Sequence, residues 1–248
     1  LFHGLGHRAT LLHHRLAAPL AIQWLDLPVS RLAQSESFAQ FACDLILRAR
    51  TLHRCYNLAL NDFRRTNKIR NASQPLPNLK GSYEPTDPLE LPLWLFTPNQ
   101  PRLPLFIRSQ NQDILIRDHQ YDLFHLPASL LADPEQGPAA LLAALKHHNL
   151  QLRPRALTLT AFTRLFLADY FIHGIGGAVY DQVTDHIIRD FYQIRPPAFA
   201  CTSATLLLPL GEFPPPSRII EQIRQVAHQL RDLDFNPQRY LPAFPAEN

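Results

Sequence analysis

The chain has 248 residues, of which 46% are hydrophobic and 18% are charged, and 24 Lys and Arg against 21 Asp and Glu give a net charge of +3. This composition is typical of a globular chain that buries one sizeable core or two small ones, and it argues against intrinsic disorder. The basic residues are scattered along the sequence. We therefore expect neither nucleic acid nor a membrane among the partners.

The three cysteines are isolated, at Cys43, Cys55 and Cys201, and none belongs to a CxxC pair. This pattern fits a reducing compartment and offers neither a disulfide framework nor a structural zinc site. The chain has no methionine, and no segment of it resembles a signal peptide. We therefore expect a cytoplasmic protein and a fragment of a longer chain.

The most apolar run, residues 156–172, is interrupted by Arg164 and Asp169. It is too short to cross a bilayer uncharged, so we interpret it as a core segment. A charge within such a run is costly unless it is paired, and we expect Asp169 to pair with Arg155 or His173.

Residues 1–80 are expected to form a mostly helical segment after a short strand at residues 21–25. Apolar residues recur at spacings of three, four or seven from residue 37 to about residue 68. This periodicity predicts one long helix, capped by Ser35 or Ser37. Its opposite face is basic and is interpreted as a solvated face rather than as a phosphate site.

Residues 81–248 are expected to form an α/β core that is continuous with the N-terminal segment as one domain. A proline-rich stretch at residues 73–92 leads into it over the surface. Between residues 91 and 126, short apolar or alternating segments predict an antiparallel meander. Its strands are expected at residues 91–96, 104–108, 113–117 and 121–126. A helix is then expected from about Pro138 to His148.

The C-terminal half alternates strands with helices, and residues 153–210 contain a glycine-rich strand-to-helix turn. After the apolar helix, the expected elements are a strand at 170–173, a helix at about 179–191, a strand at 198–208 and a helix at 217–233 capped by Ser217. Alternation of this kind predicts a mainly parallel sheet with helices packed on it.

Three of the eight glycines of the chain stand close together, at Gly174, Gly176 and Gly177. Glycines between a strand and a helix let the backbone turn sharply and approach a ligand, and the first amides of the helix attract anions. The spacing is neither the dinucleotide pattern G-x-G-x-x-G nor a P-loop. Two interpretations remain open, a phosphate or carboxylate site and a tight turn that is only architectural.

Side chains that can transfer protons surround these glycines. His173 precedes them, and Asp181 and Asp185 share one face of the helix that follows, so these three are the candidate catalytic residues. Helix capping and interaction with the helix dipole are the alternative explanation for the two aspartates. The spacing of metal ligands is absent, and we expect no metal.

Other residues near the turn carry groups that could bind an anionic ligand. They include arginines before the core helix, a tyrosine in the first helical turn and hydroxyls where the next strand ends. The candidate ligand-binding residues are Arg153, Arg155, Gly174, Gly176, Gly177, Tyr180, Thr202, Ser203 and Thr205.

The run of residues 153–209 resembles a family of bacterial proteins with the signature HGIGGAxYDxxTDxII, as do RTNKIRNASQPLPNL at 65–79 and RDLDFNPQRYL at 231–241. Its layout is also similar to that of the bacillithiol-biosynthesis cysteine-adding enzymes, in which an apolar helix, a short strand, a glycine pair, a Tyr-bearing helix and a Ser/Thr-containing strand follow one another. That resemblance implies a Rossmann-like core and ligase-type chemistry on an amino-sugar thiol precursor. It carries over Gly176, Gly177, Tyr180 and the strand of residues 203–205, although HGIGGA replaces the glycine-glycine-proline turn of those enzymes.

Two functional hypotheses follow. The first is an enzyme of cysteine-ligase-like type, a ligase or transferase, in which residues 174–177 bind a phosphate or carboxylate and His173 or Asp181 transfers protons. A nucleotide is a possible cofactor. The second is a noncatalytic ligand-binding or protein-interaction module. A pocket over the turn lined by Arg153 or Arg155 would favour the first, and aspartates that point to solvent would favour the second.

Overall fold

The computed structural model describes residues 25–82, 84, 87–97, 100–205 and 216–239. The chain divides into two compact units, Leu1–Ser203 and Ala204–Asn248, which are described separately. Of the strand expected at residues 21–25, only Leu25 lies within the described residues, and it is exposed and outside any strand.

The main sheet of the first unit has five strands in the order β4-β3-β2-β1-β5, and every neighbouring pair in it is antiparallel. Its strands are β1 (Leu89–Phe96), β2 (Leu103–Gln110), β3 (Asp113–Arg117), β4 (Asp122–Pro127) and β5 (Gln151–Pro154). The first four are the strands of the expected meander, which is confirmed. Short apolar segments joined by tight turns predict antiparallel neighbours because such turns can connect only strands of opposite direction.

Two of these turns are built from polar residues. Asn111 lies between β2 and β3 with φ 55°, a left-handed conformation that asparagine tolerates better than most residues. Between β3 and β4, the Asp118 carboxylate accepts hydrogen bonds from the backbone N–H groups of Gln120 at 2.6 Å and Tyr121 at 2.7 Å. These turns fix the register of the meander.

The prediction of a mainly parallel, Rossmann-like sheet is wrong. β5 joins the edge of the antiparallel sheet, where Leu95 of β1 faces Leu152. Among the described residues, the only parallel pair is β6 (Phe171–His173) with β7 (Phe199–Cys201). Alternation along the sequence indicated parallel neighbours, but the first strand of the C-terminal half pairs with the meander instead of with the strands that follow it.

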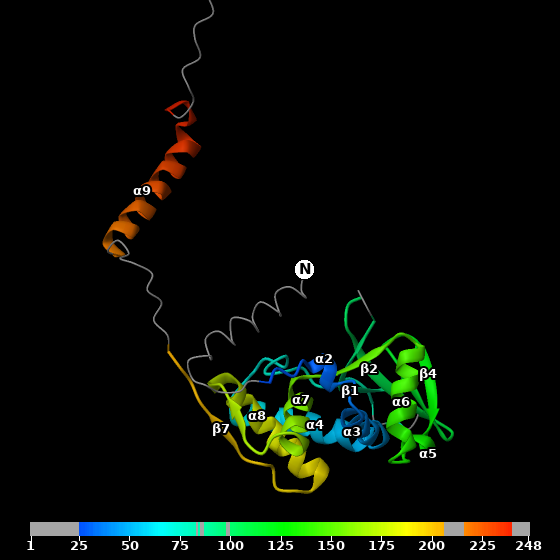
Figure 1. Cartoon of the computed structure of the whole chain (residues 1–248). Coiled ribbons are helices and arrows are strands. Elements are labelled where there is room, and N and C mark those ends of the chain that lie inside the picture. Colours follow the sequence, from blue (N-terminus) through cyan, green and yellow to red (C-terminus); the bar gives the residue numbers. More distant parts are fainter. Residues whose placement is uncertain (1–24, 83, 85–86, 98–99, 206–215, 240–248) are drawn as a thin grey trace, which may run out of the picture. The chain divides into compact units, whose positions relative to one another are not determined.

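The helices of the first unit lie against the sheet and against one another (Figure 1). They are α2 (Val29–Leu32), α3 (Glu36–Leu47), α4 (Ala49–Thr66), α5 (Ala128–Leu131), α6 (Gln136–His147), α7 (Ala156–Phe166) and α8 (Ile175–Ile187), which continues as the π-helical turn η2 (Ile188–Tyr192). In Figure 1, α5, α6 and β4 lie at one end of the unit and α8 and β7 at the other.

The single long helix expected from residue 37 to residue 68 is divided into α3 and α4. Ser35 caps α3 as predicted, because its Oγ accepts a hydrogen bond from the backbone N–H of Phe38 at 3.2 Å. The division falls at Arg48, whose φ of −102° and ψ of 23° are not helical. The apolar repeat continues across this residue and therefore did not reveal the break.

The hydrophobic core lies between α3, α4 and α7 and one face of the sheet. Phe38 of α3 and Phe162 of α7 are fully buried with their ring centroids 5.2 Å apart. Leu91, Leu93 and Leu95 alternate along β1 and are also fully buried, as expected for residues on one face of a strand. This core holds α7 in place, and α8 packs against both α7 and α4.

In the second unit, the described residues form α9 (Pro216–Phe235) and the 3-10 turn η3 (Pro237–Arg239). The helix begins one residue before Ser217, so this serine lies inside the first turn and not at the cap position. Across the described part of the chain, no helix is both long and apolar enough to cross a membrane.

Candidate functional site

The glycine segment lies at the carboxyl ends of the two parallel strands. β6 ends at His173, Gly174 is the N-cap residue of α8, and the backbone N–H of Thr202 donates to the carbonyl oxygen of His173 at 2.9 Å. Gly174 and Thr202 are therefore neighbours just beyond the strand ends. Ligands of α/β proteins commonly bind in this position relative to parallel strands.

The helix begins earlier than the sequence predicted. We expected it from about residue 179, but α8 starts at Ile175, so Gly176 and Gly177 lie in its first turn rather than in the loop before it. None of the three glycines has a positive φ, and their backbone conformation alone does not require glycine. What decides whether another residue fits at these positions is the space around each Cβ position.

At Gly177 that reason is His173. A Cβ built on Gly177 would lie 2.6 Å from Nδ1 of His173, much closer than real Cβ contacts, whereas one built on Gly174 or Gly176 would meet nothing within 4 Å. The imidazole ring thus lies against the first turn of α8 in space that only a glycine leaves free. The glycine is needed for the histidine, and the expected explanation through a sharp backbone turn is not the one that the structure supports.

His173 is held from its other side by Asp181. Its Nε2 lies 3.0 Å from Oδ2 of Asp181, and the two side chains are 10% and 2% exposed. The two atoms are within contact distance, although their alignment is not that of an ideal hydrogen bond. Phe171 and Phe199 flank the ring edge-to-face, with centroids 4.7 Å and 5.0 Å away. The ring orientation is therefore fixed by a carboxylate and two aromatic neighbours.

Asp181 itself belongs to a buried network with α7. It accepts a hydrogen bond from Nη1 of Arg164 at 2.6 Å, and Thr160 Oγ1 donates to its other oxygen at 2.8 Å. Thr160 also lies 3.2 Å from the hydroxyl oxygen of Thr184, which is completely buried. The carboxylate thus has a partner for each oxygen, as a buried charge requires.

The second aspartate binds the other end of the same guanidinium group. Nη2 of Arg164 donates to Asp185 at 2.6 Å and also to the carbonyl oxygen of Pro197. The guanidinium lies over the ring of Phe199, 4.8 Å from its centroid. The side chain of Asp185 is 29% exposed, so this half of the network reaches the surface.

The charge state of Asp181 is set by two opposing effects. Burial disfavours the carboxylate and tends to raise its pKa, while hydrogen bonds from Thr184, Thr160 and His173 and the charge of Arg164 act in the other direction. The hydrogen bonds and the Arg164 charge outweigh burial, and the pKa of Asp181 is lowered from its usual value. The lowered pKa keeps Asp181 an anion near neutral pH.

The arginines proposed as ligand contacts lie elsewhere. Arg155 binds Glu90 of β1 at 2.6 Å and stacks 4.0 Å from the centroid of Trp94. It precedes α7, whereas Arg164 lies in the last turn of that helix, so roughly 13 Å of helix separates them. Arg153 donates to the carbonyl oxygen of Leu152 and does not reach the turn. Both arginines make these contacts within the main sheet and not at the glycine segment.

The other predicted residues divide into two groups. Thr202 and Ser203 are exposed in the segment that follows β7, and Thr205 is also exposed but belongs to the second unit. Tyr180 packs against Phe63 of α4, with ring centroids 6.4 Å apart, and so faces another helix. Thr202, whose backbone N–H donates to the carbonyl oxygen of His173, therefore lies near the candidate site, whereas Tyr180 faces α4.

Asp169 also departs from expectation. It lies beyond the end of α7 and is exposed, so it needs no buried partner. Arg164 is a buried charge of this region whose role sequence reasoning missed. The signal was present as polar pairs on apolar helices, Thr160 with Arg164 and Asp181 with Thr184 or Asp185, at the three- and four-residue spacings that place side chains on one helix face.

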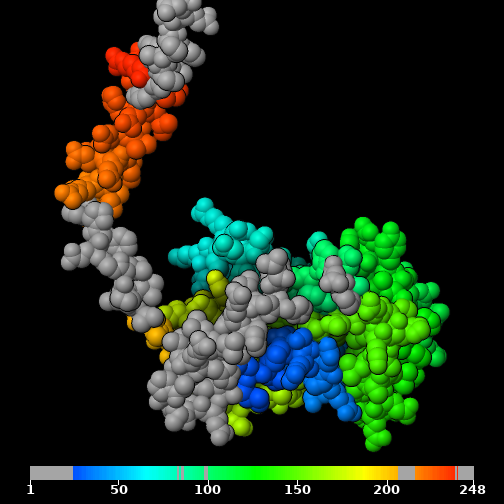
Figure 2. Space-filling view, turned by 45° about the horizontal axis from the view of Figure 1, so that its top comes forward, coloured from blue at the N-terminus to red at the C-terminus, as the bar shows by residue number. Residues whose placement is uncertain are grey.

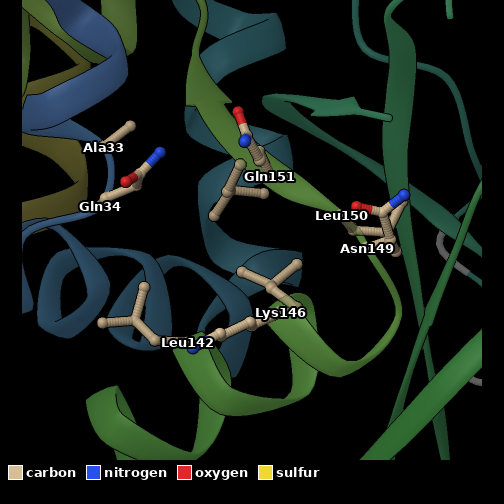
Figure 3. A pocket seen from close by; sticks show the side chains of 9 residues that line it. Ala33, Gln34, Leu142, Lys146, Asn149, Leu150 and Gln151 are labelled. Atoms are coloured by element: carbon tan, nitrogen blue, oxygen red, sulfur yellow. The ribbon is translucent and has the colours of Figure 1, made fainter. Parts of the chain in front are cut away.

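A separate hollow of about 370 Å³ lies between the turn before α3, helix α6 and the approach to β5. Figure 2 shows the blue surface of the first helices beside the green surface of α6 and the sheet, and Figure 3 shows Gln34 and Gln151 on opposite sides of the hollow. Leucines line much of it, and Lys146 is the charged residue among the described ones. No carboxylate or imidazole is among the described residues that line the hollow, and none of the predicted site residues is among them.

No set of three His, Cys, Asp or Glu residues in the described ranges is arranged to hold a metal ion. No protein-family model, no curated protein and no solved structure matches the chain.

Proposed function

We propose that the protein is an enzyme whose catalytic site lies at the amino end of α8, with His173 as the group that transfers protons. The observation that carries this proposal is the environment of the imidazole. Its Nε2 lies against the buried Asp181 carboxylate, whereas Nδ1 has no protein partner among the described residues and lies at the first turn of α8. A histidine oriented by a carboxylate, with its second nitrogen free, is the usual arrangement of a general acid or base.

The same turn provides a place for a negatively charged substrate. The first helical backbone bond of α8 runs from the N–H of Ala178 to Gly174, so the N–H groups of Ile175, Gly176 and Gly177 have no partner within the helix. These residues are exposed. Free amides at the positive end of a helix favour phosphate or carboxylate groups. An anion bound there would lie beside Nδ1 of His173.

The chemistry we propose is of the cysteine-ligase type, a ligase or transferase reaction. Its support is the resemblance of residues 153–209 to the cysteine-adding enzymes, together with the exposed hydroxyl-bearing residues Thr202 and Ser203 beside the turn. Cysteine, an amino-sugar conjugate and a nucleotide are then the first ligands to test. We assign the activity to the cytoplasm, because the three cysteines are free thiols and suit a reducing compartment.

One observation favours the alternative, a noncatalytic module for protein interaction. Three large apolar side chains around the turn are exposed: Tyr170 by 70%, Ile172 by 55% and Ile175 by 61%. Neighbouring exposed apolar residues often mark an interaction surface. In this alternative the Arg164–Asp181 network only fixes α8 to α7, and His173 fills space under Gly177.

A thermal-shift experiment separates the two functions. The protein is heated with L-cysteine, ATP, inorganic phosphate or glucosaminyl malate, and the series is repeated with His173→Gln and with Asp185→Asn, which touches Arg164 but not the histidine. A ligand at about a hundred times its dissociation constant stabilises the folded state by roughly 2.7 kcal/mol. The enzyme proposal predicts a saturable shift with at least one of these compounds that is weakened in His173→Gln and kept in Asp185→Asn.

The opposite result would be a melting temperature that none of the four compounds changes, or a shift that His173→Gln retains in full. Either result would remove the support for a site at His173. The interaction-module alternative would then be the better account of the glycine segment.

A further inference from the structure

The helix of the second unit, α9, exposes an apolar seam along its length. None of the helix residues is buried, and the apolar side chains of the seam are between 39% and 62% exposed. The seam residues are Ile219, Ile223, Val226, Leu230 and Leu233. An apolar stripe of this size on a water-soluble helix needs a partner surface.

The spacing of the seam indicates what kind of surface fits it. Successive seam residues are four, three, four and three positions apart. The mean spacing of 3.5 residues is that of the a and d positions of a coiled coil, in which the seam stays aligned with a second helix. A broader stripe that follows 3.6 residues per turn is what packing onto a globular core usually requires.

The residues that flank the seam permit pairing of identical helices. In a coiled coil the flanking e and g positions of the two helices face each other, and like charges there would repel. Four of the five flanking positions within α9 are uncharged, namely Ile220, Gln222, Ala227 and Gln229, and Asp234 is the exception near the end. Repulsion between two copies is therefore confined to one terminal position.

Apart from Asp234, the charged residues of α9 lie away from the seam, and the positive and negative charges of the helix are equal in number. Arginines at 218, 224 and 231 are matched by acidic residues at 221, 232 and 234. Amphipathic helices that lie on anionic membranes carry an excess of Lys and Arg on the polar face, and α9 has none. Asp232 on this outer side binds Asn236 at 2.7 Å and Arg239 at 3.4 Å, which ties η3 to the helix and leaves the seam open.

We propose that α9 pairs with α9 of a second copy of this chain through the seam, as a short coiled coil. The helix offers five aliphatic side chains, so the pair would bury ten, along a seam about 21 Å long at 1.5 Å per residue. Two and a half heptads make a short zipper, and the dimer is expected to dissociate on dilution. This inference is independent of the activity proposed for His173.

Sedimentation of the full chain over a roughly hundredfold dilution series tests the pairing, since self-association depends on concentration. The wild type is expected to pass from dimer to monomer as it is diluted. Leu230→Glu places a charge in the seam and is expected to be monomeric throughout. The matched control Gln225→Glu adds the same charge on the outer side and is expected to behave as the wild type.

A second measurement does not depend on the strength of pairing. Val226→Cys and the control Gln225→Cys are each made in a Cys201→Ser background, because Cys201 is the exposed native thiol. Oxidation is expected to crosslink Val226→Cys into dimers and to leave Gln225→Cys largely monomeric. A wild type that is monomeric at every concentration and does not crosslink through Val226→Cys overturns the proposal, as does a dimer that Leu230→Glu leaves intact.

Discussion

Gly177 and His173 occupy one shared space, because a Cβ on Gly177 would lie 2.6 Å from Nδ1 of the histidine. The neighbouring Gly176 has open space where its Cβ would stand. Two glycines one residue apart in the same helical turn therefore have different reasons to be there. The difference can be measured directly.

Gly177→Ala is expected to destabilise the protein by about 1–3 kcal/mol, because the methyl group must displace the imidazole from its place against Asp181. Gly176→Ala is expected to be neutral or to stabilise by up to about 1 kcal/mol, since alanine is the better helix former and its methyl meets nothing. Urea unfolding of the two variants measures both effects. Equal changes in the two variants would show that His173 does not constrain position 177.

Removal of the Asp181 carboxylate is expected to cost more than removal of Asp185. Asp181→Ala leaves Arg164 buried without its main partner, and breaking such a buried pair typically costs about 3–5 kcal/mol. Asp185→Ala leaves the Arg164–Asp181 contact intact at a partly exposed site, and we expect about 1 kcal/mol or less. Denaturant unfolding compares the two variants. A larger loss of unfolding free energy in Asp185→Ala than in Asp181→Ala would show that the partly exposed contact stabilises the fold more than the buried one.

The same carboxylate should make stability depend on pH in acid. Because the pKa of Asp181 is lowered in the folded state, its stabilising contribution is fully present above the unfolded pKa of about 3.9 and is lost as the pH falls through the folded value. The difference in unfolding free energy between the wild type and Asp181→Asn should be constant from pH 7 to about pH 5 and should shrink below about pH 4. A difference that stays constant to about pH 2 would contradict the lowered pKa.

The three thiols should differ in reactivity. Burial raises the pKa of Cys43 to about 11 and also raises the pKa of Cys55, while Cys201 is exposed at the end of β7. Since the thiolate is the reactive form, a disulfide reagent at pH 8 should modify one thiol rapidly in the native protein and all three after unfolding. Cys201→Ser should abolish the rapid phase. A rapid phase that persists in this variant would show that a buried cysteine is accessible.

Local features of the fold could be predicted from the sequence. The meander strands follow from short apolar segments between turn residues, and the Ser35 cap follows from a hydroxyl before an apolar repeat. Both are encoded by neighbouring residues. The break at Arg48 was not predicted because the apolar period continues through it.

Long-range pairings could not be predicted in the same way. The pairing of β5 with β1 joins residues about sixty positions apart, and no local pattern distinguishes it from a parallel neighbour. The candidate site shows the same limit. His173, Asp181 and the glycines were found from their proximity in the sequence, but the Arg164–Asp181 contact depends on how α7 and α8 pack, and Arg155 was misplaced because its distance from the site is set by the length of α7.

The central claim, that Nδ1 of His173 is free to exchange a proton with a bound anion, can be tested by proton–nitrogen correlation spectra of the imidazole rings. The His173 signals are identified by their loss in His173→Gln, and L-cysteine, inorganic phosphate and ATP are then added in turn. Our account predicts that at least one compound shifts Nδ1 in a saturable manner, and that Gly177→Ala, which displaces the ring, loses this response while Asp185→Asn keeps it. A His173 ring whose Nδ1 signal responds to none of these compounds would contradict a catalytic site at the amino end of α8.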